Sequence, residues 1–162
     1  MNRSETSPSE KPVSPRAEAD WEKYFDLRWR VLRAPWGQQR GSEKDEREAD
    51  SRHFMIIGPG EEALAVGRLH FNSRDEAQVR FMAVTPEMRG RGLGSAILRA
   101  CEDAARTAGA GSIVLNARED VVPFYARHGF VSIGPAETLF GVVRHVRMRK
   151  DLCVRPSERQ HT

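Results

Sequence analysis

The segment Arg89-Gly90-Arg91-Gly92-Leu93-Gly94 decides the fold predicted for this chain of 162 residues. It follows an apolar segment, Val79–Val84, and precedes a segment with helical periodicity that begins near Gly92. Three glycines allow a tight turn and a close approach of the backbone to a ligand. The two arginines stand beside a predicted helix N-terminus, where unpaired N–H groups and the helix dipole favour an anion. The segment therefore predicts a pyrophosphate-binding turn.

Spacing separates three phosphate-binding designs. A P-loop requires a Gly-Lys pair that this chain lacks. A dinucleotide fingerprint requires a glycine or alanine where this chain has Ser95 or Ile97. It also requires an acid about twenty residues later, where Asn116-Ala117-Arg118 stands instead. The remaining pattern, an Arg or Gln followed by xxGxG, is satisfied by Arg89, Gly92 and Gly94. An ordinary Gly/Arg-rich turn without a ligand stays open on this motif alone.

The segments after this turn narrow the choice of family. A helix from about Gly92 to Gly109 is predicted by apolar residues at helical spacing, and Ser112–Asn116 reads as a short buried strand. The next predicted helix carries Phe124-Tyr125-Ala126-Arg127-His128-Gly129-Phe130 and a last strand follows at 142–148. Motifs, order and spacing together resemble the GNAT superfamily of acetyl-CoA-dependent N-acetyltransferases over residues 20–151.

The resemblance implies an α/β (α+β) fold with one mixed, mostly antiparallel sheet flanked by helices and a strand-loop-helix acetyl-CoA site. Earlier segments fit: a helix at Asp20–Arg33 and strands at His53–Ile57, Ala63–Phe71 and Gln78–Val84. It further implies that Tyr125 is the general acid for the departing thiolate. The residues expected to bind the cofactor are Met82, Ala83, Val84, Arg89, Gly90, Arg91, Gly92, Leu93, Gly94, Ser95 and Asn116.

The general base is the weakest part of the prediction. Some family members carry a Glu on the strand before the turn, but this chain has Gln78-Val79-Arg80 there. His53 and His145 are the alternative bases, because an imidazole titrates near neutral pH. Each also reads as a structural histidine of a strand. A low-pKa amine acceptor or a water relay stays open as well.

The acceptor side is predicted from the first helix and the loop after it. Leu27–Val31, Arg52-His53 and the late His145-Val146-Arg147-Met148 resemble the ElaA-like branch of the family, although no strand is evident before Trp21. Such a strand is either absent or lies within Pro12–Ala17. Trp36 and Glu43 are candidate substrate residues. The acidic cluster of Glu43, Asp45, Glu46, Glu48 and Asp50 fits a solvated helix face capped by Ser42, or a lip that attracts an amine.

Amino-acid composition indicates the number of domains and argues against membrane, nucleic-acid and metal-binding proteins. The 39% hydrophobic and 30% charged residues fit one soluble domain, expected at residues 19–152 between a disordered tail at 1–18 and a second tail at 153–162. Neither a signal peptide nor an apolar run of membrane-spanning length is present in this sequence. The net charge of +3 is modest, so nucleic acid is not the expected partner. Cys101 and Cys153 have no metal or disulfide spacing, so we expect no metal and a cytoplasmic location.

Two functions follow from these observations. The first is an N-acetyltransferase in which a primary amine of a small molecule or peptide attacks acetyl-CoA directly. The alternative is a catalytically inactive CoA-binding sensor or scaffold. Whether the protein forms a homodimer is left open.

Overall fold

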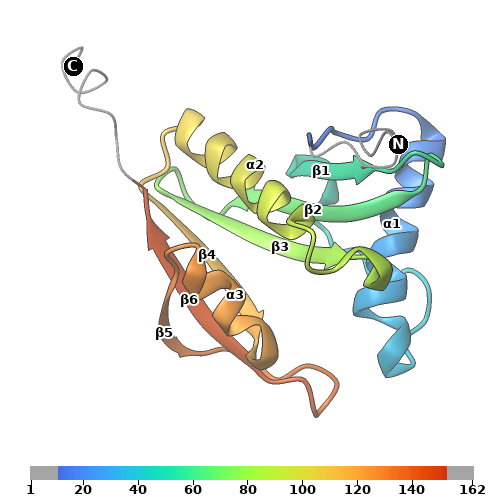
Figure 1. Ribbon diagram of the computed structural model, residues 1–162. Helices are drawn as coiled ribbons and strands as arrows, with labels where there is room; N and C mark the ends of the chain where they lie inside the picture. Colours follow the sequence, from blue (N-terminus) through green and yellow to red (C-terminus); the bar gives the residue numbers. More distant parts are fainter. Residues whose placement is uncertain (1–10, 153–162) are drawn as a thin grey trace. The chain divides into compact units, whose positions relative to one another are not determined.

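The computed structural model describes residues 11–152 (Figure 1). Positions 1–10 of the predicted N-terminal tail, and all of the predicted C-terminal tail with Cys153, lie outside the described residues. The tail and domain boundaries therefore stay predictions.

A mixed sheet of six strands, flanked by three α-helices, confirms the predicted fold class. The strand order in the sheet is β1-β2-β3-β4-β6-β5. The helices are α1 (Glu18–Leu32), α2 (Leu93–Thr107) and α3 (Val122–Arg127). The strands are β1 (Arg52–Ile57), β2 (Ala63–Phe71), β3 (Glu76–Val84), β4 (Ser112–Arg118), β5 (Val131–Pro135) and β6 (His145–Asp151).

The chain divides into two compact units, and the first lies within Met1–His70 and Phe81–Cys101. Here β1 pairs antiparallel with β2, and α1 and α2 lie against opposite faces of β2. Two successive residues of β2, Gly67 and Arg68, show which helix covers which face of the strand, because neighbouring side chains of a strand point to opposite faces. A Cβ on Gly67 would meet Ile97 of α2, whereas Arg68 shares Glu48 with Arg28 of α1.

Packing of α1 forms the apolar core of this unit. Asp20 fixes the helix start, because its carboxylate accepts the backbone N–H groups of Arg16 and Ala17. These bonds lower the pKa of the Asp20 carboxyl, so the cap is charged at neutral pH. The buried cluster joins Tyr24 and Leu27 of α1 to Met55, Ala63, Val66 and Ala83 of the strands.

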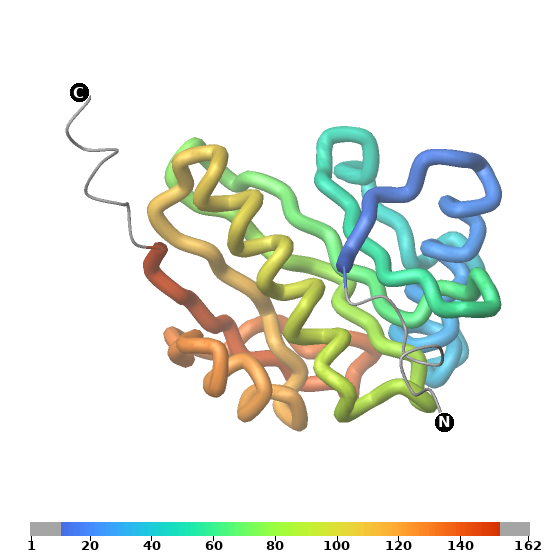
Figure 2. The backbone as a smooth tube through the Cα atoms, turned by 45° about the horizontal axis from the view of Figure 1, so that its top comes forward, coloured from blue at the N-terminus to red at the C-terminus, as the bar shows by residue number. Residues whose placement is uncertain are grey.

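The second unit lies within Phe71–Arg80 and Glu102–Thr162. In it β4 pairs parallel with β3 from Glu76↔Ser112 to Val79↔Leu115, and antiparallel with β6 on its other side. The strand β5 pairs only with β6 in the sheet order and exposes Val131 and Ile133. Figure 2 follows the chain from β4 through α3 into this β5–β6 pair.

Most predicted elements agree with the structure to within a few residues, but four segments differ. The acidic segment is not a helix, because it forms turns and a single 3-10 turn at Glu48–Asp50. The predicted last strand at 142–148 lies instead at His145–Asp151, and β5 was not predicted. The doubtful first strand is reduced to one bridge, in which Val13 and Met55 exchange two backbone hydrogen bonds of 2.8 Å.

Candidate active site

The turn between β3 and α2 has the backbone that its sequence predicts. After the 3-10 turn Pro86–Met88, Gly90 and Gly92 adopt φ values of 80° and 83°. Only glycine adopts such angles readily. Helix α2 begins directly afterwards, and its first backbone bond runs from the Ala96 N–H to the Gly92 carbonyl at 3.0 Å.

This arrangement leaves room and charge for an anion. A Cβ on Gly90 or Gly92 would meet no other atom within 4 Å, so the space beside both residues is open. Arg89 and Arg91 are exposed, and the first N–H groups of a helix have no partner inside the helix. The turn therefore combines open space, two cations and helix N–H donors.

Strand β3 carries an irregularity immediately before Met82, Ala83 and Val84. Phe81 has φ 56°, in the left-handed region that a bulky residue rarely adopts. Ala83 is buried in the core of the first unit, whereas Met82 and Val84 are half-buried. The Thr85 N–H donates to the Leu64 carbonyl at 2.9 Å, which fixes the end of β3 to β2.

Asn116 lies on β4 opposite Arg147 of β6. Its Oδ1 accepts a 3.3 Å bond from Nη1 of Arg147, whose Nη2 lies 3.7 Å from Glu76. That bond involves only the carbonyl oxygen of the side chain, and the amide nitrogen has two further donors.

Tyr125 is placed by α3 and its neighbouring aromatic side chains. The residue is 7% exposed, and its ring makes edge contacts with Phe124 and Phe130 at centroid distances of 5.0 and 5.9 Å. The ring orientation is thus fixed by packing, so the hydroxyl has a defined position.

His53 is a buried histidine with both ring nitrogens engaged. Nδ1 lies 2.8 Å from the Tyr24 hydroxyl and Nε2 lies 2.7 Å from the Glu48 carbonyl oxygen. Burial is the main cause that lowers the pKa of His53, so the ring is neutral at neutral pH. To accept a proton from a substrate, His53 would have to give up one of these bonds.

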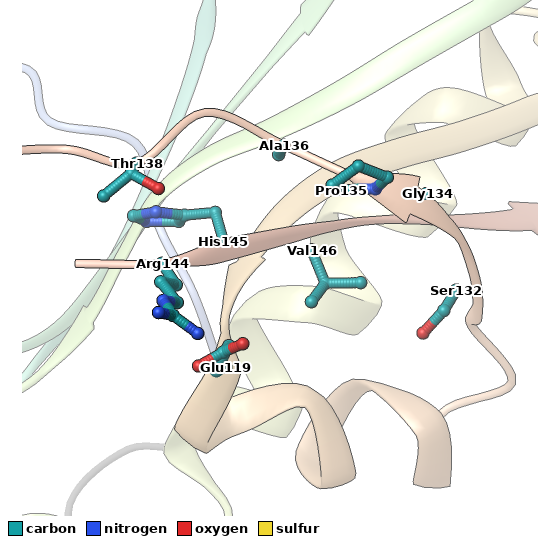
Figure 3. Close-up of a pocket in the computed structure, with 9 residues that line it drawn as sticks. All are labelled: Glu119, Ser132, Gly134, Pro135, Ala136, Thr138, Arg144, His145 and Val146. Carbon is teal, nitrogen blue, oxygen red and sulfur yellow. The ribbon is translucent and has the colours of Figure 1, made fainter. Parts of the chain in front are cut away.

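His145 has a different environment at the start of β6. Its Nδ1 lies 3.0 Å from the Val143 carbonyl, which only accepts, so Nδ1–H donates and Nε2 is the acceptor of the neutral ring. The residue lines a cavity of about 410 Å³ together with Glu119, Thr138, Arg144 and Val146 (Figure 3). His145 therefore stands at the wall of an open pocket.

The two candidate substrate residues lie in the chain between α1 and β1. Trp36 closes a 3-10 turn, Ala34–Trp36, and is half-buried. Glu43 is 5% exposed, and its Oε1 accepts the Gly41 N–H at 2.7 Å. Its carboxylate therefore shapes the loop.

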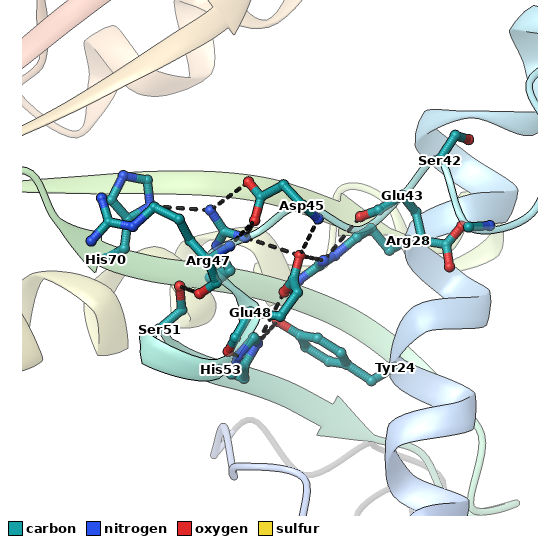
Figure 4. A network of polar contacts seen from close by, with 12 residues as sticks. Tyr24, Arg28, Ser42, Glu43, Asp45, Arg47, Glu48, Ser51, His53 and His70 are labelled. Carbon is teal, nitrogen blue, oxygen red and sulfur yellow. Dashed lines mark hydrogen bonds and ion pairs between the residues drawn. The ribbon is translucent and has the colours of Figure 1, made fainter.

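A buried ionic network in the first unit was not predicted (Figure 4). Arg28 and Arg68 are both 0% exposed and share the carboxylate of Glu48, at 2.9 and 3.0 Å. Arg68 also forms a two-bond pair with Asp45, at 2.6 and 3.0 Å. The available signal was Arg68 itself, a charged residue inside the apolar segment Ala63–Phe71.

Residues 11–152 lack two features that would point to other functions. No group of three or more His, Cys, Asp or Glu side chains in that range is arranged to hold a metal ion. No helix in the same range is long and apolar enough to cross a membrane.

Comparison with known proteins identifies the class to which this site belongs. Residues 21–130 match the Acetyltransferase (GNAT) family, and the chain belongs to that family. The uncharacterized N-acetyltransferase YjcF of Bacillus subtilis is 33% identical over 109 residues, which cover 67% of this chain and 76% of YjcF. The protein is an N-acetyltransferase.

Solved structures agree on the fold. An acyl-CoA N-acyltransferase from Pseudomonas aeruginosa has a TM-score of 0.73 at 20% identity, covering 86% of this chain and 97% of its own. An aminoglycoside 6'-N-acetyltransferase complexed with coenzyme A also has a TM-score of 0.73, at 13% identity, covering 90% and 98%. The resemblance to the ElaA-like branch stays a prediction.

Proposed function

We propose that this protein transfers the acetyl group of acetyl-CoA to a primary amine by direct attack of the amine on the thioester. The observation that carries the proposal is the turn before α2. Its two left-handed glycines leave open space, and its two exposed arginines and helix N-terminus suit the negative charge of a pyrophosphate. The aminoglycoside acetyltransferase of the same fold is complexed with coenzyme A.

The acyl-bearing arm of the cofactor would meet β3 and Asn116. In this proposal the backbones of Met82 and Val84 pair with the pantetheine, and the Asn116 amide donates to the same arm. The left-handed φ of Phe81 supports this role, because a residue outside the extended region turns the backbone N–H groups beside it away from the regular strand direction. One of those N–H groups would stabilise the oxyanion of the tetrahedral intermediate.

Breakdown of the intermediate requires an acid for the coenzyme A thiolate. Tyr125 is proposed for this step, because its ring is fixed by Phe124 and Phe130 and its hydroxyl carries a transferable proton. As the C–S bond breaks, the sulfur takes the electron pair and receives this proton. The attacking nitrogen loses one proton, which water carries back to the Tyr125 phenolate. The amide product and free coenzyme A then leave.

The amine must be neutral before it can attack. At about pH 7.4, deprotonating a lysine-type amine with a pKa near 10.4 costs roughly 4 kcal/mol, whereas an α-amine near 7.8 costs about 0.5. Because a strand carboxylate is missing at Gln78–Arg80, the chain favours an acceptor with a low pKa. Nε2 of His145, on the wall of the pocket, is a candidate base. Trp36 and Glu43 stay proposed acceptor contacts.

The test is acetyl-CoA turnover against a panel of amines that spans α-amines, lysine side chains and aminoglycosides. Release of the coenzyme A thiol, with the acetylated product identified by mass, would establish the reaction. Tight binding of acetyl-CoA without turnover of any amine would favour the inactive CoA-binding alternative, which the N-acetyltransferase relatives do not support. Absence of binding would overturn the proposed function.

A further inference from the structure

Phe81 is held in a conformation that its own chemistry disfavours. Three residues other than glycine have positive φ within residues 11–152: Glu61, Phe81 and Phe140. Glu61 and Phe140 lie in loops, whereas Phe81 lies inside β3. A left-handed aromatic residue in a strand persists only where its surroundings enforce it.

Two guanidinium groups provide that constraint. Cζ of Arg28 lies 4.2 Å from the centroid of the Phe81 ring, and Cζ of Arg68 lies 4.9 Å from it. Both distances fall within the range of a cation–π contact, which strengthens when the cation is removed from water. Because both arginines are fully buried, the Phe81 ring contacts two desolvated cations. Cζ of Arg33 lies farther from the same centroid, at 5.5 Å.

The acidic segment fixes both arginines in turn. Arg28 donates to Glu48 Oε2 at 2.9 Å, to the Glu43 carbonyl at 3.0 Å and to the Tyr24 hydroxyl at 2.9 Å. Arg68 binds Asp45 and Glu48, and its Nη2 also donates to Nδ1 of His70 at 3.1 Å. Two buried cations therefore meet two carboxylates, and each guanidinium plane is fixed by several bonds. Figure 4 shows Arg28 with the two acidic residues, Asp45 and Glu48.

Stability alone does not account for this network. Buried ion pairs lose hydration, and apolar residues of the same volume often stabilise a fold equally well. The network is also incomplete, because Arg28 Nε, Arg68 Nε and Glu48 Oε1 are buried and have no hydrogen-bond partner in the described residues. What these residues do provide is a fixed geometry at Phe81, one residue before Met82.

We propose that Arg28 and Arg68 are positioning residues that hold the left-handed Phe81 and thereby aim the backbone N–H groups of Met82–Val84 at the thioester. The inference rests on the proposed function, because it assigns those N–H groups to acetyl-CoA. The arginines act through Phe81 and do not themselves contact substrate. The acidic segment then serves to orient them.

The first test compares Arg68→Lys and Arg28→Lys with Arg30→Lys. Lysine keeps the charge but loses the planar group that stacks and binds two oxygens. Arg30, on the same helix, pairs with Asp26 at the surface and serves as the control. We expect kcat to fall at least about ten-fold in the first two variants, with KM for acetyl-CoA changed less than about three-fold. Unchanged kcat in both variants would overturn the proposal.

A double-mutant cycle separates positioning from general destabilisation. If Arg68 acts through the ring, Arg68→Lys should have little further effect on kcat in a Phe81→Leu background. If the decreases in kcat caused by Arg68→Lys and by Phe81→Leu were fully additive, the proposal would be contradicted. The thermal unfolding midpoint of each variant is measured first. The kinetics are then recorded at a temperature below all midpoints, so that only folded protein is compared.

A readout that does not need an acceptor distinguishes this inference from the proposed function. Amide hydrogen exchange of Met82–Val84 should accelerate in Arg68→Lys, but not in Arg30→Lys. If the wild type acetylates no amine while this exchange difference is found, the proposed function fails and the constraint on Phe81 stands. Equal exchange in both variants would refute the constraint whatever the activity.

Discussion

The Tyr24 hydroxyl lies 2.8 Å from Nδ1 of His53, a ring whose tautomer is fixed by the contact of its other nitrogen. Nε2 faces the Glu48 carbonyl oxygen at 2.7 Å, so Nε2 carries the proton and Nδ1 accepts from Tyr24. The Tyr24 hydroxyl in turn accepts a 2.9 Å bond from Arg28. A proton on Nδ1 would remove an acceptor and place a third cation beside Arg28 and Arg68.

The first prediction is therefore a loss of stability at mildly acidic pH. Burial lowers the pKa of His53 in the folded protein, whereas the unfolded chain binds this proton near pH 6.5. Below about pH 6.5 the unfolded state holds more protons, so the free energy of unfolding falls by at most about 1.4 kcal/mol per pH unit, until the folded pKa is reached. Urea unfolding from pH 5 to 8 measures this slope. His53→Gln should reduce the slope of the free energy of unfolding against pH. An unchanged slope in this variant would show that other groups cause the pH dependence.

The second prediction concerns the turn before α2. Gly94→Val introduces a branched side chain at the second residue of α2, in the proposed path of the pyrophosphate. We expect acetyl-CoA affinity to fall at least about ten-fold, equivalent to about 1.4 kcal/mol. Ala108→Val places the same side chain just after the far end of α2 and should bind normally. Calorimetric titration of both variants measures the effect, and unchanged affinity in Gly94→Val would exclude the assigned phosphate site.

The third prediction assigns the Asn116 amide to the pantetheine arm. Asn116→Ala should weaken acetyl-CoA binding by one hydrogen bond, about 0.5–1.5 kcal/mol. Because Asn116 also accepts a bond from Arg147, Arg147→Ala is measured as the control. An equal loss in both variants would mean that Asn116 acts only by placing Arg147. A loss confined to Asn116→Ala supports direct contact.

The sequence predicted the elements whose signals are local. The periodicity of α2, the glycines at Gly90 and Gly92, and the alternation around β2 depend on neighbouring residues, so their positions were readable. The strand β5 was missed, because Val131 and Ile133 are exposed on a strand that pairs only with β6. Because β5 has no buried face, its sequence carries no signal of burial that would predict a strand.

The network around Phe81 could not be predicted, because it depends on tertiary contacts. Arg28 and Glu48 are separated by twenty residues, and Arg68 by another twenty from Glu48, so no short pattern joins them. The acidic residues suggested a solvated face, since charged side chains are mostly exposed. In the structure Asp45 and Glu48 are partly buried, because two arginines on α1 and β2 compensate their charge. Glu43 is buried, and its carboxylate accepts the Gly41 N–H.

The last prediction concerns Tyr125 and separates an enzyme from a binding module. Tyr125→Phe keeps the ring that packs on Phe124 and Phe130 and removes only the hydroxyl. General acid catalysis contributes about 10²–10⁴-fold, so we expect kcat to fall at least roughly ten-fold. Acetyl-CoA affinity should change less than about three-fold, because the hydroxyl contributes little to binding. Steady-state kinetics give kcat, calorimetry gives the affinity, and the thermal midpoint reports any structural role of the hydroxyl. A lowered midpoint with unchanged kcat would assign Tyr125 to the fold and the proton transfer to water or another residue.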